Sequence, residues 1–181
     1  MAEPRNRYSQ VSLILHWLIA LMVIGQIGLI MAHDATDGDL SRSLVMLHKS
    51  VGLSILVLTL VRLGWRIANP AIPLPAEMPK WQALLARGTH VLFYLVLIGM
   101  PLGGWAASSA AGRDIDFFGL FTIPPLPVGE NGDLAGRIFD AHALGGTVFL
   151  ALIVLHVLGA LKHTFVDRSG GIFRMLPFGR A

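Results

Sequence analysis

The sequence predicts an all-α integral membrane protein, a bundle of four transmembrane helices that forms a single membrane domain. Of its 181 residues, 54% are hydrophobic and 14% are charged, whereas about 25% of the residues of soluble proteins are charged. The apolar residues gather into four segments, each at or above the length of about 20 residues that a spanning helix needs. These segments are apolar nearly all round, and a soluble helix would show a polar stripe instead. The predicted helices cover residues 11–32, 44–67, 83–107 and 138–163.

The basic residues predict which side of the membrane each loop occupies. With four spans both termini lie on one side, and ten of the 14 Lys and Arg residues fall on that side. Because short cytoplasmic loops are enriched in Lys and Arg, both termini are expected in the cytoplasm. This bias accounts for the net charge of +3, so no nucleic-acid partner is inferred. The basic residues on the outer side are Arg42, Lys49, Arg113 and Arg137.

The first span carries a histidine near its cytoplasmic end. Arg5 and Arg7 precede the apolar run, as basic residues precede the core of a secretory signal. The run is too long for such a signal, and no small-residue pair suited to cleavage follows it, so we expect it to remain as a helix. His16 lies about one turn inside this helix. It is therefore predicted at the level of the cytoplasmic face.

The second and third spans each carry one further histidine. His48 lies about one turn inside the outer end of the second span. His90 lies on the cytoplasmic part of the third span. Two interpretations of His90 are open, either as a packed, hydrogen-bonded side chain or as part of a quinone or propionate site. The loop after this span, residues 110–137, is predicted to lie along the outer interface and cover the mouth of the bundle.

The last span carries two histidines that face the same way at different depths. His142 and His156 are 14 residues apart, which is close to four helical turns and about 21 Å along the axis. That separation fits within a hydrocarbon core of about 30 Å. By depth, His156 pairs with His16 near the cytoplasmic face, and His142 pairs with His48 near the outer face.

Two histidines in each layer match the needs of a haem iron better than those of other sites. A structural zinc ion takes four ligands and a catalytic one three. A proton relay would combine histidines with intramembrane Asp or Glu, and the spans contain almost none. A porphyrin iron needs only two axial ligands, and because the chain has no cysteine, its haem would be held without a covalent link. With both axial positions filled, the remaining chemistry is outer-sphere transfer of one electron at a time.

Three basic residues lie near the predicted layers. Lys49 either extends outward to the lipid headgroups, pairs with a haem propionate, or attracts an anion. Arg62 and Arg66 lie four residues apart at the cytoplasmic boundary. The positive-inside rule explains both arginines, and pairing with a propionate is a further hypothesis.

Each of the four spans carries a longer motif around its histidine. The motifs are "ILHWL" in the first span, "LHKSVGLSILVLTLVRLGWR" in the second, "THVLFYLVLIGMPLGGW" in the third and "HALGGTVFLALIVLHVLGALKHTF" in the fourth. Taken together, these motifs resemble the bacterial cytochrome b561 family of di-haem membrane cytochromes. The resemblance implies a multi-pass protein of the bacterial inner membrane that binds two haem b groups. Its axial ligands would be His16 with His156 and His48 with His142.

The resemblance also implies an oxidoreductase. The best-defined activity of the family is superoxide oxidase, which passes electrons from periplasmic superoxide to ubiquinone on the cytoplasmic side. His163 matches the position implicated in the quinone site, with Lys162 beside it. One departure concerns the substrate, because an anion is best captured by a positive field and the outer loops carry four basic and eight acidic residues.

Two alternatives stay open. One is a haem-bearing electron-transfer anchor that links the quinone pool to another redox protein. The other is a haem-free membrane protein whose histidines are structural.

Overall fold

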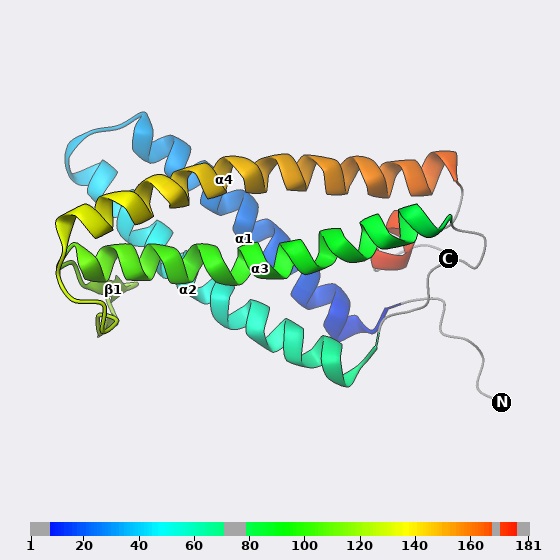
Figure 1. Ribbon diagram of the computed structural model, residues 1–181, viewed down its shortest axis with the longest axis horizontal. Coiled ribbons are helices and arrows are strands. Elements are labelled where there is room, and N and C mark those ends of the chain that lie inside the picture. The colour runs from blue at the N-terminus through cyan, green and yellow to red at the C-terminus, as the bar shows by residue number, and fades with distance from the viewer. Residues whose placement is uncertain (1–7, 71–78, 168–170, 177–181) are drawn as a thin grey trace.

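The computed structural model describes residues 8–70, 79–167 and 171–176, and within them four long helices form an antiparallel bundle (Figure 1). All four are long and apolar enough to cross a membrane. Helices α3 and α4 run side by side along the long axis, and α1 and α2 cross behind them. The helices are α1 (Gln10–Asp34), α2 (Gly38–Ala68), α3 (Lys80–Ala110) and α4 (Gly132–Leu161).

The buried core lies in the middle of the bundle and draws on all four helices. Ile19 and Val23 of α1 and Ile55 of α2 are almost fully buried. Leu97 of α3 and Phe149 of α4 pack against them. Elsewhere long apolar side chains face outward, which is the arrangement expected of helices that contact lipid. The core therefore separates the two ends of the bundle.

The helices extend beyond the predicted spans because their polar ends continue past the apolar segments. Helix α4 begins at Gly132, ahead of the predicted residue 138, where the Asn131 side chain caps it by accepting a hydrogen bond from the Leu134 amide across 2.9 Å. The connection between α1 and α2 is only three residues long. His33 lies in the last turn of α1 rather than in this connection. Its Nδ1 is 2.6 Å from the hydroxyl oxygen of Ser41, near the start of α2.

The outer loop between α3 and α4 contains a small β-hairpin that the sequence analysis missed. Strands β1 (Ile115–Phe117) and β2 (Phe121–Ile123) pair antiparallel. The buried Ile115 packs against Leu53 and Leu56 of α2. The Ser50 hydroxyl donates to the Asp116 carbonyl across 3.0 Å and accepts from the amide of Phe118 across 3.1 Å. The hairpin is therefore anchored on the outer half of α2.

The C-terminal segment folds back against the beginning of α1. After α4 come a short π-helix, η1 (Lys162–Val166), and a 3₁₀ helix, η2 (Gly171–Met175). The Trp17 indole donates to the Met175 carbonyl across 2.7 Å. At Gly171 a Cβ would lie 2.4 Å from the Thr164 hydroxyl oxygen, so only glycine fits this turn. The start of α1 and the end of the described chain thus lie at the same end of the bundle.

Candidate functional site

His16 and His156 face each other near the end of the bundle that holds the start of α1. Their ring centroids are 6.4 Å apart, and both side chains are half-buried. With metal–nitrogen bonds of about 2 Å, imidazoles on opposite sides of one metal ion have ring centres roughly 6 Å apart. The two rings are therefore spaced as the axial ligands of one iron would be. We call this pair the inner layer.

His48 and His142 form an equivalent pair at the other end, which we call the outer layer. Their ring centroids are 6.1 Å apart, and both are half-buried. Helix α4 supplies one ring to each layer. The other ring comes from α1 in the inner layer and from α2 in the outer layer. The pairing predicted from depth is thus the pairing that the folded chain brings together.

His90 also contacts the inner layer. Its ring centroid is 6.0 Å from that of His156, and Phe93 lies 5.1 Å from the same ring. The side chain of His90 is exposed, and its Nδ1 is 2.6 Å from the carbonyl of Ala86 on its own helix. His90 is thus hydrogen-bonded to its own helix but not packed, and it lies beside the histidine pair, so both of its interpretations stay open.

The residues of both layers fit an iron porphyrin. In the described part of the chain, no group of three or more His, Cys, Asp or Glu residues could hold a metal ion, so the count needed by zinc is not met there. Nδ1 of His48 and of His142 are buried without a hydrogen-bond partner among the described residues. A Cβ on Gly104 would lie 3.2 Å from Cε1 of His142. Glycine thus keeps the space beside this imidazole clear.

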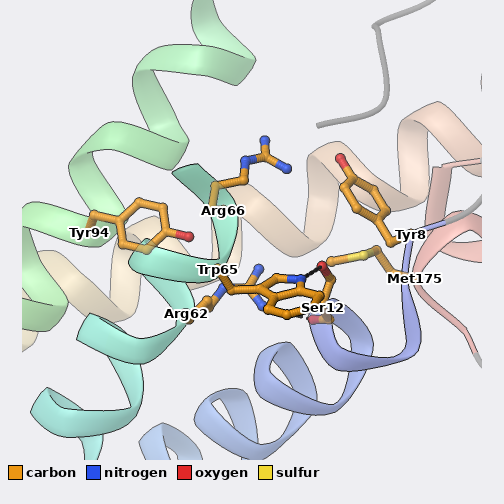
Figure 2. Close-up of a pocket in the computed structure, with 7 residues that line it drawn as sticks. All are labelled: Tyr8, Ser12, Arg62, Trp65, Arg66, Tyr94 and Met175. Carbon is orange, nitrogen blue, oxygen red and sulfur yellow. Dashed lines mark hydrogen bonds between the residues drawn. The ribbon is translucent and has the colours of Figure 1, made fainter. Parts of the chain in front are cut away.

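Arginines line a pocket next to the inner layer (Figure 2). Arg62 donates to the Ser12 carbonyl across 3.0 Å, one helical turn before His16. Its positive charge is close enough to interact electrostatically with the imidazoles of both His16 and His156. Arg66 lies over the Tyr8 ring, 5.8 Å from its centroid. The pocket is lined by Tyr8, Ser12, Arg62, Trp65, Arg66, Tyr94 and Met175.

Two basic residues near the outer layer are close enough for their charges to repel each other. Lys49 directly follows His48 and is half-buried, and its charge interacts with that of Arg113 in the outer loop. Acidic residues lie there too, because Asp116 is held on Ser50 and Asp140 stands two residues before His142.

The short π-helix η1 presents a cluster of three polar side chains at the inner end. His163 Nδ1 and Lys162 Nζ lie 2.6 and 2.8 Å from the same Asp167 carboxylate oxygen. These hydrogen bonds, with that of Lys162 as the largest contribution, hold the pKa of the Asp167 carboxyl below its ordinary value. Sequence reasoning singled out His163 and Lys162 and missed Asp167, although its spacing of four residues from His163 is a helical contact spacing.

The sequence matches known proteins over nearly its whole length. A family model described as prokaryotic cytochrome b561 matches residues 7–178. The chain belongs to this family. It is 33% identical over 176 residues to cytochrome b561 homolog 2 of Escherichia coli K12, covering 94% of this chain and 92% of that protein. It is 30% identical over 172 residues to a protein named probable superoxide oxidase CybB of Yersinia pestis, covering 95% and 97%.

Membership of the cytochrome b561 family carries two conclusions. The protein transfers electrons in a bacterial membrane, and the family binds b-type haem. A third relative, cytochrome b562 of Cereibacter sphaeroides, is 29% identical to this chain over 175 residues. The match covers 93% of this chain and 94% of the relative. When bound, haem supplies reversible one-electron chemistry, and the histidines of the two layers on α1, α2 and α4 would be the residues to hold it.

Proposed function

We propose that this cytochrome b561 carries electrons across the inner membrane from periplasmic superoxide to ubiquinone, using two haem b groups. His16 and His156 would hold the haem on the cytoplasmic side, and His48 and His142 the haem on the periplasmic side. Two superoxide anions would release two dioxygen molecules and two electrons at the outer face. Ubiquinone would take up those electrons with two protons at the inner face.

The observation that carries this proposal is the pair of cross-helix histidine contacts. Their centroid distances of 6.4 and 6.1 Å both match bis-imidazole ligation of iron. The protein supplies each layer with one histidine from α4, about 21 Å apart along that helix. Two centres at different depths give electrons a path between the two faces.

The charged residues support an assignment of roles to the two ends. Lys49 and Arg113 place two positive charges near the outer layer, and positive charge at the mouth of a site draws small anions to it. Arg62 and Arg66 lie where they could pair with the propionates of the inner haem. The bias of Lys and Arg to the side of the termini favours a cytoplasmic location for the inner layer. The name of the Yersinia pestis relative supports superoxide as the electron donor.

The C-terminal cluster supports quinone chemistry at the inner end. His163 and Lys162 of η1 share the carboxylate of Asp167, which directly follows η1. Single π-helical turns within α-helices often mark functional sites. Histidine is the side chain that most often transfers protons in catalysis. We propose that this cluster contributes protons or hydrogen bonds to the reduced quinone, and that His90 lies at the edge of the same region.

The first experiment measures haem. The purified chain, expressed with sufficient haem, should show a Soret band and two haem b groups per chain. A chain without a Soret band would establish the haem-free alternative. One haem per chain would contradict the two-layer arrangement.

The second experiment measures the donor. Superoxide generated enzymatically should reduce the haems of the purified chain in the presence of a quinone analogue, and added superoxide dismutase should abolish that reduction. Reduction no faster than spontaneous dismutation would exclude superoxide as the donor. Co-purification of a stoichiometric redox subunit would then favour the electron-transfer anchor.

A further inference from the structure

Gln26 is a polar side chain within the first apolar span, and it contacts the outer layer. Its Nε2 donates a hydrogen bond to the main-chain carbonyl of His48 across 2.9 Å. This bond joins α1 to the helix that carries one of the two outer histidines. Polar groups within a membrane are expensive and usually have a function, so Gln26 calls for one.

The position of the Gln26 amide depends on Gly52, one helical turn after His48. A Cβ on Gly52 would lie 3.0 Å from Nε2 of Gln26. Even an alanine would force the amide to move by a few tenths of an ångström. The absence of a side chain at Gly52 therefore lets the amide lie directly against the backbone of α2.

Two buried polar atoms of this contact have no partner at full hydrogen-bond geometry in the described part of the chain, although the main chain of Gln26 also approaches the His48 ring. They are Oε1 of Gln26, which accepts hydrogen bonds, and Nδ1 of His48. The contrast with His90 is informative, because Nδ1 of that ring lies 2.6 Å from the Ala86 carbonyl of its own helix. When Nε2 of an imidazole ligates a metal, Nδ1 carries a hydrogen atom and normally donates it to an acceptor.

We propose that Gln26 is a positioning residue for His48. When iron is bound, Oε1 of Gln26 accepts the hydrogen bond from Nδ1 of His48, while Nε2 of Gln26 keeps its bond to the His48 carbonyl. This inference rests on the assignment of His48 as an axial ligand in the proposed function. An acceptor at Nδ1 makes the imidazole more basic, which favours ferric iron and lowers the reduction potential. Gln26 thus sets the potential at which the outer centre accepts an electron.

The test is a redox titration of the outer haem, followed by its optical spectrum. A His16→Ala background holds only this haem, so a single transition is measured. Gln26→Leu removes the acceptor at similar volume and should raise the midpoint potential by about 59 mV, a tenfold change in the one-electron equilibrium. Gln26→Glu keeps an acceptor with more negative charge and should lower the potential.

Two further variants complete the design. Gly52→Ala displaces the amide and should raise the potential by less than Gln26→Leu does. Ser54→Ala is the matched control on α2, because the Ser54 hydroxyl donates to the Ser50 carbonyl of its own helix across 2.9 Å. It should leave the potential unchanged. If Gln26→Leu binds no outer haem, the signs of the shifts in Gln26→Glu and Gly52→Ala decide the outcome.

The haem content of each variant distinguishes a failure of the Gln26 role from a failure of the assignment of His48 as a haem ligand. If the outer haem is retained and no variant shifts its potential, the role of Gln26 is overturned while the proposed function stands. Shifts of the same sign for Leu and Glu would show a packing effect and would also overturn it. If His48→Ala retains the outer haem, the ligand assignment itself is wrong and the role of Gln26 falls with it.

Discussion

The rings of His16 and His156 lie with their centroids 6.4 Å apart, although they belong to the first and last spans of the chain. Helices α1 and α4 make almost no close backbone contact with each other. The two imidazoles therefore reach toward each other across the space between the backbones of α1 and α4. A planar group held between two imidazoles requires this arrangement.

Each layer should lose its haem independently of the other. His142→Ala removes an outer ligand and His156→Ala removes an inner one, and the buried core between them keeps the layers separate. We expect haem content to fall from two groups per chain to one in each variant, with different residual spectra. If the two variants gave the same residual spectrum, the assignment to layers would be contradicted.

His16 should be the inner ligand opposite His156, although His90 lies equally close. The His90 ring is exposed and bonded to the Ala86 carbonyl, whereas His16 is half-buried and faces the interior. His90→Phe should keep both haems, and His16→Ala should lose the inner one. Haem quantification of the two purified variants is the measurement, and loss of haem from His90→Phe alone would reverse the assignment.

The space at Gly104 should be needed for the outer haem. A Cβ there would already lie 3.2 Å from Cε1 of His142, so Gly104→Val must displace the imidazole. We expect the outer haem to be lost or low in occupancy. The control is Gly99→Val on the same helix, because a Cβ there would meet no atom within 4 Å beyond its chain neighbours and its own helix backbone in the described chain. Equal haem content in the two variants would rule out this steric role.

Neutralising the outer cations should slow the capture of superoxide. Lys49→Gln combined with Arg113→Gln removes both positive charges, and the rate of haem reduction should fall about tenfold at low ionic strength. The difference should shrink as salt is added. Arg42→Gln is the control, because Arg42 is exposed and already paired with Asp39. A similar loss in Arg42→Gln would point to overall charge instead.

The C-terminal turn should loosen in acid. Because the pKa of Asp167 is lower in the folded state, the stabilisation by its ionised form is fully present above the ordinary pKa of about 3.9. It is lost as the pH falls through the depressed value. Amide hydrogen exchange of residues 160–167, corrected for its intrinsic pH dependence, should show this loss. Asp167→Asn should show weak protection at every pH, and unchanged protection in that variant would refute the role of the carboxylate.

The helices and the histidine layers were predictable because both depend on short-range periodicity. The length of each apolar run predicts a span, and the spacing of His142 and His156 places them on one face of one helix. The hairpin of β1 and β2 was missed because its strands are too short to show a pattern and depend on packing against α2. Neither the contact between Gln26 and His48 nor the neighbours of His90 follow from local sequence, since each depends on how two helices pack.

The buried core around Ile19, Val23 and Ile55 has a consequence for energy conversion. Among the described residues, the side chains of this cluster are apolar and give protons no polar groups to follow, although electrons can tunnel through it. Under the proposed function, each electron would move inward with no accompanying proton, so it would perform electrical work against a cytoplasm that is negative inside. That work is about 2.3 kcal/mol for each 100 mV of membrane potential. Turnover in energised vesicles should therefore slow as the voltage rises and recover when an ionophore discharges it.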